Sequence, residues 1–293
     1  MGTEDELVLP STSDLCQPFD TNPVAEERRA KHPPTPGRVD YHGGMRVIGL
    51  LLDLDGTLYV GSEAVSGARG AVARLKEAGL ALRYVTNTTR MPRRAVVERL
   101  RTLGFEVTER EVFTPARAAA RVIRDESCLA LVDESLLEDL EGITLTEESP
   151  GFVLVGDLGE GFTYGRLDAA FRCLMEGAKL VALQKNRYWR TGSGLSLDAG
   201  PFVAALEYAS GERAGVVGKP EEAFFRIALE DLGLEAGEVA MVGDDAEADV
   251  AGAKRAGLLG VQVKTGKWRP DAEGGEADLV LDSVAGLPEA LGV

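Results

Sequence analysis

The sequence predicts an α/β protein built on a doubly wound parallel sheet, with a second α/β domain inserted into it. The first sign is an unbroken apolar run over residues 47–52 that ends at Asp53 and Asp55. Such runs are typical of strands that are buried on both faces of a parallel sheet. The second sign is the order strand, helix, strand over residues 47–86, which forms a βαβ unit with parallel strands. The third is the return of this pattern after residue 215.

Composition excludes several classes of function. The net charge of −16 argues against a nucleic-acid partner, which would need a basic face. No apolar run approaches the ~20 residues that span a bilayer, so we expect no membrane partner. The three cysteines are widely spaced and form no CxxC pair. This pattern suits a reducing compartment and predicts a cytoplasmic protein.

Histidine chemistry is excluded from the region that we predict to fold. The only two histidines, His32 and His42, precede the first strand. No Ser-His-Asp triad, Cys-His pair or His-ligated metal can therefore form after it. Catalysis would have to use carboxylates, lysine, hydroxyl groups, backbone amides and a bound ion.

Residues 1–44 contain six prolines among polar and charged residues and show no apolar periodicity. Such a segment buries too little apolar surface to offset the entropy lost on ordering, so we predict a disordered extension. Met45 stands immediately before the first strand. Translation starting at Met45 is therefore our hypothesis.

The remaining elements follow in chain order. A helix is predicted over 67–79, where a glycine ends it, and a parallel strand over 81–86. Helices over 92–104 and 115–125 come next. Short apolar strands then alternate with helical segments: 129–132, 135–140, 152–155, 166–176 and 180–183. Residues 90–190 would thus cover a core of their own, which predicts an inserted domain.

The first pattern resumes after this insertion. A helix with apolar spacing at Phe202, Val203 and Leu206 leads back to a short strand before Lys219. The elements predicted after it are a helix at 222–232, a strand at 239–243, a helix at 246–256, a strand at 259–264, a strand at 277–281 and a helix at 284–291.

Polar side chains follow four predicted strands at their carboxyl ends, the edge at which ligands bind in open α/β sheets. They are Asp53 and Asp55, Thr86 and Asn87, Lys219, and Asp244 with Asp245 and Asp249. Each group alone is a weak signal, because a surface turn, a helix cap or a loop would also explain it. Their shared position is more specific. Two carboxylates ~4 Å apart repel by ~4 kcal/mol at an effective dielectric near ~20, which favours a bound cation.

These residues resemble the four motifs of the haloacid dehalogenase (HAD) superfamily of phosphatases: DLDGT, a strand-end Thr-Asn, Lys-Pro and GDD-x-x-x-D. The inserted domain resembles the type IIA cap of that superfamily. The resemblance implies a Rossmann-like core over 45–89 and 191–293 and a cap over 90–190. VVGKP, MVGDDAEADVAGA and VKTGKWRP further resemble the sub-branch that contains phospholysine phosphohistidine inorganic pyrophosphate phosphatase.

The resemblance also implies roles for the motif residues. Asp53 would attack phosphorus to give an aspartyl-phosphate, and Asp55 would protonate the leaving oxygen and then deprotonate water. Mg²⁺ held by Asp53, Asp244 and the backbone carbonyl of Asp55 would supply positive charge.

Four further residues have implied supporting roles. Lys219 would neutralise the nucleophile and the phosphoryl oxygens, and Thr86 with the Asn87 backbone amide would bind those oxygens. Asp249 and Asp245 would orient metal-bound water without contacting the ion.

The cap should select the substrate by closing over the crevice. The residues that leave cap strands are candidates for contact with the leaving group: Asp157, Lys185, Asn186, Arg187 and Tyr188. Solvated loop residues are an equally good interpretation of this set.

The implied function is Mg²⁺-dependent hydrolysis of small phosphorylated metabolites. Two alternatives stay open: phosphoryl transfer to an acceptor other than water, and a non-catalytic binding or regulatory protein that keeps the fold. The resemblance suggests pyrophosphate or phosphoamino acids as substrates, and a homodimer through the caps as in related proteins.

Overall fold

The computed structural model describes residues 39–40, 46–191, 194–269 and 277–293. Most of the 1–44 extension, together with Met45, lies outside the described residues. Within it, β1 (Val39–Asp40) forms a short strand that pairs antiparallel with β2 (Arg46–Val47). A strand at these two residues was not expected from the sequence.

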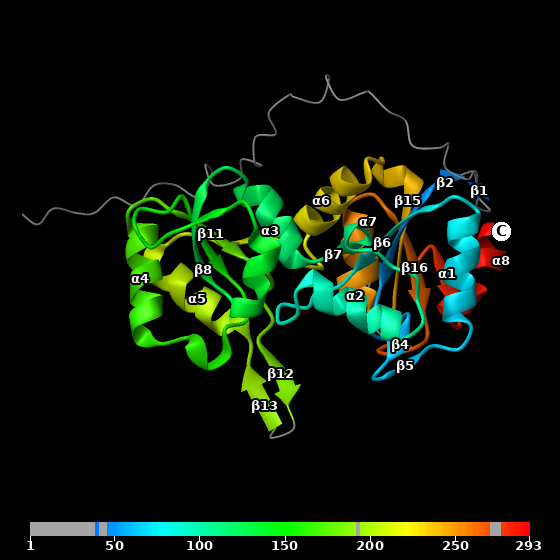
Figure 1. The fold of residues 1–293 in the computed structure, drawn as a ribbon, viewed down its shortest axis with the longest axis horizontal. Helices are drawn as coiled ribbons and strands as arrows, with labels where there is room; N and C mark the ends of the chain where they lie inside the picture. The colour runs from blue at the N-terminus through cyan, green and yellow to red at the C-terminus, as the bar shows by residue number, and fades with distance from the viewer. Residues whose placement is uncertain (1–38, 41–45, 192–193, 270–276) are drawn as a thin grey trace, which may run out of the picture. The chain divides into compact units, whose positions relative to one another are not determined.

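A six-stranded sheet forms one of the two main layers of strands (Figure 1). In spatial order its strands are β17 (Leu279–Leu281), β16 (Leu259–Val263), β15 (Val239–Gly243), β3 (Gly49–Asp53), β6 (Ala81–Val85) and β7 (Val112–Phe113). Every pair of neighbours is parallel. The predicted parallel sheet is confirmed, and the residues that follow its strands meet at one edge.

Helices cover both faces of this sheet and bury its central strand on both sides. Leu50 and Leu52 of β3 pack into one apolar cluster, and Leu51 packs into another. The first cluster includes α1 (Ala68–Glu77), α2 (Arg93–Thr102) and α8 (Leu287–Leu291). The second includes α3 (Pro115–Ile123), α6 (Glu222–Leu232) and α7 (Gly252–Arg255).

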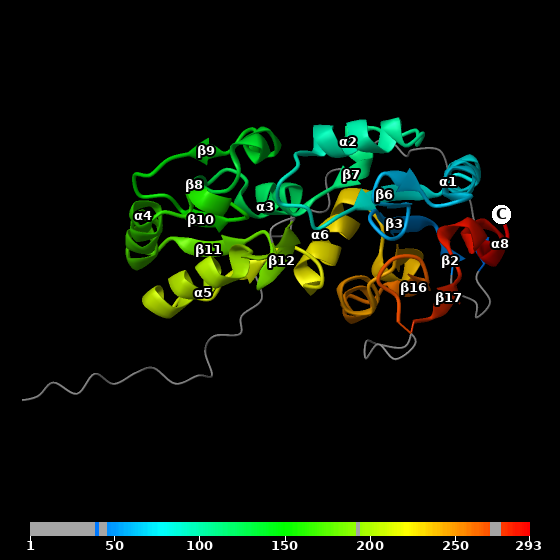
Figure 2. The ribbon, with the colours of Figure 1, turned by 90° about the horizontal axis from the view of Figure 1, so that it is seen from below.

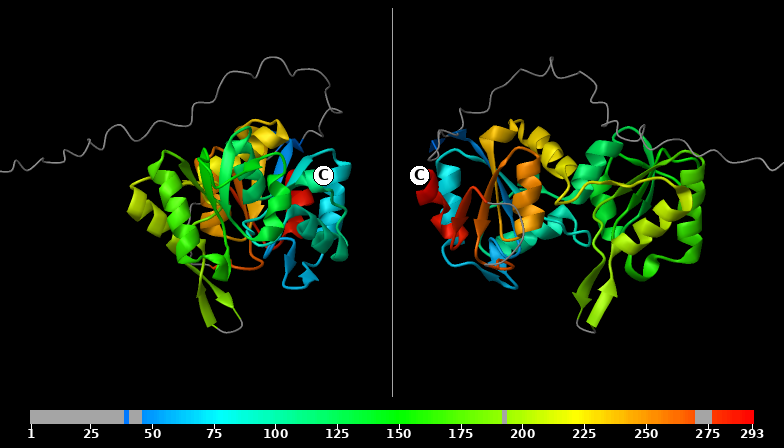
Figure 3. Two further views of the ribbon diagram at one scale, coloured as in Figure 1. Left: turned by 60° about the vertical axis from the view of Figure 1, so that its left-hand side comes forward. Right: turned by 180° about the vertical axis from the view of Figure 1, so that it is seen from behind.

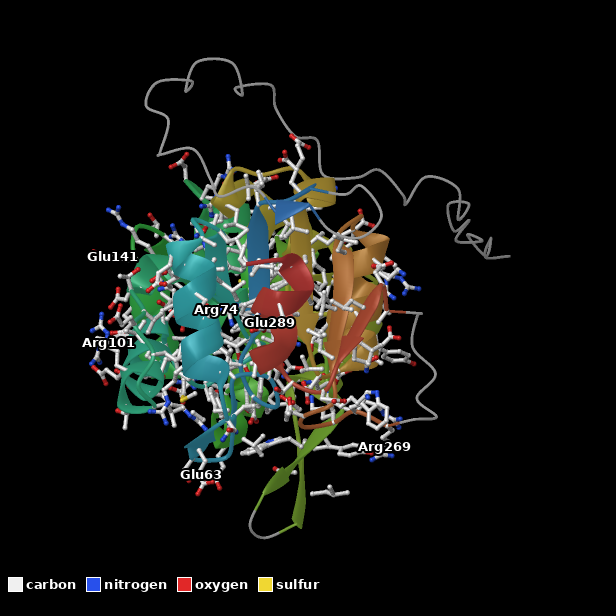
Figure 4. The ribbon with its side chains drawn as sticks, turned by 90° about the vertical axis from the view of Figure 1, so that its right-hand side faces the viewer. Glu63, Arg74, Arg101, Glu141, Arg269 and Glu289 are labelled. Atoms are coloured by element: carbon white, nitrogen blue, oxygen red, sulfur yellow. The ribbon has the colours of Figure 1, made fainter. Side chains whose placement is uncertain are left out.

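An ion pair joins the first and last helices of the first face. Arg74 of α1 and Glu289 of α8 lie against each other (Figure 4), and Arg74 also donates to the carbonyl oxygen of Val293. The two side chains are largely exposed, so solvent screens this pair and it adds little stability. Apolar contacts of Val72, Leu75 and Leu287 are what hold the two helices on the sheet.

A second parallel sheet carries its own helices (Figure 2). Its order is β14 (Gly215–Val216), β11 (Lys179–Ala182), β10 (Phe152–Val155), β8 (Ser127–Leu131) and β9 (Thr144–Leu145). Val153 and Val155 face a cluster with α4 (Tyr164–Met175) and α5 (Ala199–Ser210). Phe152 and Leu154 alternate to the other face and join the cluster of α3 and α6.

The strand pairing does not change sheet at residues 90 and 190, the boundaries expected from the sequence. Helix α2 packs on the six-stranded sheet and β7 pairs within it, whereas α5 and β14 belong to the second sheet. Both β7 and β14 are only two residues long. Strands this short have no periodicity of their own, so pairing with distant strands decides which sheet they join.

The smaller elements lie at the ends of these strands. Two antiparallel hairpins are β4 (Tyr59–Val60) with β5 (Glu63–Ala64), and β12 (Tyr188–Thr191) with β13 (Gly194–Leu197), the second of which projects beyond the second sheet (Figure 3). Short helical turns are η1 (Glu109–Glu111), η2 (Glu134–Leu140), η3 (Gly159–Gly161), η4 (Ala236–Glu238), η6 (Val284–Gly286) and the π-helical η5 (Ala246–Ala251). Across the described ranges, no helix combines the length and apolar character needed to cross a membrane.

Candidate active site

Asp53 closes the central strand β3 at the shared edge of the six-stranded sheet. Its side chain is buried, and Oδ2 accepts a hydrogen bond of 3.4 Å from the Thr57 hydroxyl. Burial raises the pKa of Asp53 above its ordinary value, and the ammonium of Lys219 opposes that shift. A carboxylate in such a site stays ionised only with positive charge beside it.

Asp55 differs from Asp53 in exposure. The strand ends between the two residues, and a tight turn follows in which the Gly56 N–H donates to the Tyr59 carbonyl at 2.7 Å. Gly56 has a φ of +87°, which favours glycine, and the Asp55 side chain is exposed. One carboxylate is therefore held inside the site while the other stands at its mouth.

Asn87 and Lys219 are joined through a pair of hydrogen bonds that the sequence did not predict. The Asn87 amide nitrogen donates to the Lys219 carbonyl at 2.6 Å, and its amide oxygen accepts from the Lys219 N–H at 2.8 Å. The expected contribution of Asn87 was its backbone amide. Thr86 lies beside it, half-buried, and its hydroxyl accepts from the Thr88 N–H at 3.2 Å.

Lys219 reaches the site from a different sheet than expected. Its preceding strand, β14, pairs with β11 of the second sheet, so the prediction that Lys219 ends a strand of the same sheet as Asp53 was wrong. Gly218 allows the approach, because a Cβ there would stand 2.3 Å from the Leu183 carbonyl oxygen. The Lys219 Nζ nevertheless lies 2.5 Å from Asp53 Oδ1 and 2.6 Å from Asp249 Oδ1.

Asp244 and Asp249 complete a buried acidic cluster with Asp53. One carboxylate oxygen of each lies within 4.8 Å of the others. Asp244 follows β15, and Asp249 returns to the same edge through η5. Gly243 leaves room for it, since a Cβ there would stand 2.1 Å from Asp249 Oδ2. The role expected for Asp249 was to orient metal-bound water, and its carboxylate lies in the cluster itself.

The charges in this cluster do not balance. Burial raises the pKa of Asp244 above its ordinary value, and it raises that of Asp249 to about 6. Burial alone would lower the pKa of Lys219, but the carboxylates of Asp249 and Asp53 outweigh it and the net shift is upward. Three ionised carboxylates around one ammonium leave two negative charges. A divalent cation with hard oxygen ligands fits this donor set.

The Asp245 side chain makes two kinds of contact that the sequence did not predict. Its Oδ1 accepts from the N–H groups of Glu247 at 3.1 Å and Ala248 at 3.0 Å, which caps the start of η5. Its Oδ2 lies 3.1 Å from the Lys267 ammonium. Burial would raise the pKa of Asp245, but these donors and the Lys267 charge lower it overall.

Asp157, a predicted leaving-group contact, forms an ion pair with another side chain. It is buried after β10, and Arg90 binds it through two nitrogens, the longer contact being 3.0 Å from Nη2 to Oδ1. The same guanidinium stacks 4.5 Å from the centre of the Trp189 ring. Arg90 comes from the loop that starts at Thr86, so this loop contacts the second sheet directly.

The other four cap candidates form a surface pocket of about 390 Å³, lined by Lys185, Asn186, Arg187 and Tyr188. The pocket residues come directly after Leu183 and Gln184, and a Cβ at Gly218 would stand 2.3 Å from the Leu183 carbonyl oxygen and 3.2 Å from Asn87 Oδ1. Lys185 is paired with Glu207 at 2.7 Å. Arg187 and Tyr188 are exposed and remain the better candidates of this set.

Residues 265–267 contact the acidic cluster and were not among the predicted site residues. The Lys267 N–H donates to Asp244 Oδ2 at 2.6 Å, and the Thr265 hydroxyl donates to the Gly56 carbonyl at 2.5 Å. Their position in the sequence could have identified them. They follow β16, a predicted parallel strand, so they reach the same edge of the sheet as Asp53.

Models of two protein families match this chain. One described as "Haloacid dehalogenase-like hydrolase" covers residues 50–146, and a second, HAD-hydrolase-like, covers residues 216–287. The matched ranges contain all of the residues of the acidic cluster.

Individual proteins are similar over most of the chain. Human haloacid dehalogenase-like hydrolase domain-containing protein 2 is 45% identical over 226 residues, which span 76% of this chain and 86% of the human protein. Bovine phospholysine phosphohistidine inorganic pyrophosphate phosphatase is 44% identical over 235 residues, or 78% and 86% of the two chains.

Solved structures share the fold. A p-nitrophenyl phosphatase from Archaeoglobus fulgidus superposes with a TM-score of 0.77 at 30% identity, covering 84% of this chain and 99% of that one. NagD from E. coli K-12 gives a TM-score of 0.74 at 26% identity, with coverage of 82% and 97%.

Proposed function

This chain belongs to the haloacid dehalogenase-like hydrolase family and is a phosphatase, and we propose that it hydrolyses small phosphorylated metabolites with Mg²⁺ through an aspartyl-phosphate on Asp53. The proposal rests on one observation above the others. A buried lysine ammonium bridges two of three clustered carboxylates, and one of the bridged carboxylates ends the central strand.

The first step is attack by an Asp53 carboxylate oxygen on phosphorus. The new O–P bond forms as the bond from phosphorus to the leaving oxygen breaks, and the electron pair goes to that oxygen. Asp55 donates a proton to it, and the alcohol or acid departs. The exposed position of Asp55 at the mouth of the site suits this role, because the leaving group has to lie toward solvent.

The second step is hydrolysis of the aspartyl-phosphate. Asp55, now ionised, takes a proton from water as the water oxygen attacks phosphorus, and Asp53 is released with inorganic phosphate. Every proton moved in the first step is returned in the second. The chain thus needs no further acid or base.

Lys219, Thr86 and Asn87 stabilise the phosphoryl oxygens in both steps. Lys219 is fixed beside Asp53 by its two ion pairs, and Asn87 holds the backbone of Lys219 in place. The Thr86 hydroxyl accepts from Thr88, so its own hydrogen is available to a phosphoryl oxygen. Donors fixed before the reaction stabilise transition-state charge without reorganising.

Asp53, Asp244 and Asp249 are the side chains that would hold Mg²⁺. When bound, the ion supplies positive charge that lets a phosphate dianion approach the carboxylates. The donor set fits the ion in type, since all three are carboxylates, and in charge, since two negative charges remain uncompensated.

Phosphate release from p-nitrophenyl phosphate, with Mg²⁺ or with EDTA, tests the proposal. We expect turnover only with the metal, and none from the Asp53→Asn variant. Asp168→Asn is a matched control, because Asp168 is paired with Arg172 on the outer surface of α4. A phosphorylated peptide containing Asp53 should be recovered after acid quenching. Turnover in EDTA, or by Asp53→Asn, would contradict the mechanism.

We propose that the substrate is small and that its leaving group contacts the pocket of residues 185–188. Pyrophosphate, phospholysine and phosphohistidine should be tested first because a relative is named for them. A metabolite panel read by phosphate release would rank substrates, and competing alcohols would reveal transfer to acceptors other than water. Arg187→Ala should change KM for the best substrate more than for p-nitrophenyl phosphate.

We also propose that the protein works in the cytoplasm. Cys128 and Cys173 are free and buried, and burial raises the pKa of both thiols. Unpaired cysteines suit a reducing compartment. Light scattering of the purified protein would show whether it forms a homodimer through the caps.

A further inference from the structure

Residues 265–267, which follow β16, contact two separate parts of the candidate active site. The strands β16 and β3 are not neighbours, because β15 lies between them in the sheet. The Thr265 hydroxyl nevertheless donates to the Gly56 carbonyl at 2.5 Å. The loop therefore passes over the end of β15, the strand that delivers Asp244.

Asp244 is enclosed where the loop passes over it. The Lys267 N–H donates to Asp244 Oδ2 at 2.6 Å. A Cβ at Gly266 would stand 2.1 Å from that same oxygen and 2.6 Å from the Gly56 Cα. A Cβ at Gly56 would also stand 2.1 Å from Asp244 Oδ2. The carboxylate thus lies between two glycines and has room for no larger residue at either.

The Thr265 contact fixes the other side of this enclosure. Gly56 directly follows Asp55, whose backbone carbonyl is an implied metal ligand. The hydrogen bond from Thr265 to the Gly56 carbonyl restricts the turn that follows β3. The Asp55 carbonyl and the Asp244 carboxylate therefore keep a fixed separation. The Lys267 side chain adds an ion pair of 3.1 Å with Asp245, which ties the loop to the cap of η5.

We propose that residues 265–267 act as a clamp that positions the Asp244 carboxylate and the turn after Asp55 for Mg²⁺. They are positioning residues and take no part in bond making. The inference rests on the proposed function, in that it needs the acidic cluster to bind Mg²⁺. It assigns a role to the Thr-Gly-Lys that follows a core strand and lies outside the four motifs.

The test measures Mg²⁺ binding to the full chain without substrate, by isothermal titration calorimetry. Gly266→Ala should weaken binding by about 10- to 100-fold, the range typical for residues that orient metal ligands. Gly211→Ala is the matched control, because Gly211 has a φ of +77° and a Cβ there would meet nothing within 4 Å. Gly266 has a similar φ of +82°, so alanine strains the backbone at both positions, and only the substitution at Gly266 displaces Asp244.

A second pair of variants avoids backbone strain. Thr265→Val removes the hydroxyl at nearly constant size and should weaken Mg²⁺ binding, whereas Thr265→Ser keeps the hydroxyl and should restore it. Lys264→Met serves as the control for this segment, because Lys264 pairs with the exposed Asp282. Thermal melts in EDTA check that each variant is folded, and the Mg²⁺ concentration that gives half-maximal turnover should rise in parallel with Kd.

The outcomes separate the clamp from the function on which it rests. Absence of Mg²⁺ binding by the parent protein would overturn both. A parent that binds Mg²⁺ and releases phosphate, with Gly266→Ala and Thr265→Val matching their controls in Mg²⁺ affinity, would overturn the clamp alone. Weaker binding in these two variants, with Thr265→Ser close to the parent, would support it.

Discussion

Replacing Lys219 with methionine should destabilise the metal-free protein strongly and the Mg²⁺-bound protein much less. The Lys219 ammonium is the cation that the structure places among Asp53, Asp244 and Asp249, at 2.5 and 2.6 Å from two of them. Methionine is an unbranched side chain that lacks the terminal ammonium group, so the substitution removes the charge with little other change of shape. The buried carboxylates then repel each other with nothing between them.

The size of the effect follows from these distances. A pair of unit charges 2.6 Å apart interacts by about 6 kcal/mol at an effective dielectric of ~20. Desolvation of the buried ions offsets part of this, and removing one partner of a buried pair costs about 3 to 5 kcal/mol. One kcal/mol lowers Tm by roughly 2 °C or more in a chain of this size. Lys219→Met should therefore melt at least about 6 °C below the parent.

The assay is a thermal melt at pH 8 in EDTA and again in excess Mg²⁺. Bound Mg²⁺ supplies the missing positive charge, so the gap between variant and parent should shrink by more than half. Lys254→Met is the control, because the Lys254 pair with Asp278 is partly exposed and worth at most about 1 kcal/mol. Equal melting of Lys219→Met and the parent in EDTA would refute the charge balance described above.

Three further predictions concern single residues. Asp53→Asn should abolish p-nitrophenyl phosphate turnover and leave the metal-free melt close to the parent, because it removes a charge that burial disfavours; activity above one per cent would reject Asp53 as the nucleophile. The pKa of Asp249 is raised from 3.8 to about 6, so the folded state binds its proton more tightly than the unfolded state does. Its contribution to stability is full below pH 3.8 and is lost as pH rises through 6, by roughly 3 kcal/mol in EDTA. Urea unfolding at pH 4 to 7 should show a smaller loss in Asp249→Asn than in the parent, since Asp53 and Asp244 keep their raised pKa values; identical profiles would count against it. Asn87→Ala frees the Lys219 backbone and should lower kcat about 10- to 100-fold, whereas an unchanged kcat would mean that Lys219 needs no such support.

Local patterns in the sequence, such as apolar runs and the residues that end them, specify much of the fold. The β3 run and the β15 run are each buried at every position, as continuous apolar strands in a parallel sheet should be. Helix α6 begins and ends at the residues predicted for it, and β10 does so too. These elements are specified by their own residues and by glycine or polar residues at their ends.

The sequence did not predict which sheet the very short strands would join. Strand β14 has two residues and could have joined either sheet as far as its composition shows. Its hydrogen bonds to β11 place the start of the Lys219 segment in the second sheet. Lys219 still reaches Asp53, because Gly218 and Asn87 fit the segment against the carboxyl edge of the first sheet.

The same distinction applies to side chains. Asp157 directly follows a cap strand, as a substrate-binding residue would, but its carboxylate is paired with Arg90. No local pattern connects residues so far apart in the sequence. Asp249 enters the acidic cluster because η5 turns it back toward Gly243. The sequence placed Asp249 near this edge, but the packing of η5 is what brings its carboxylate into the cluster.

The order of strands and helices along the sequence indicates which polar groups come to one edge, because parallel strands separated by helices end on the same side of their sheet. It thereby indicated Asp53, Thr86 and Asp244 and the need for a cation. The contacts near that edge come from tertiary packing, namely the Lys219 bridge, the enclosure of Asp244 by residues 265–267 and the pairing of Asp157 with Arg90. These contacts depend on distances between segments far apart in the chain, which packing of the two sheets fixes and local periodicity does not.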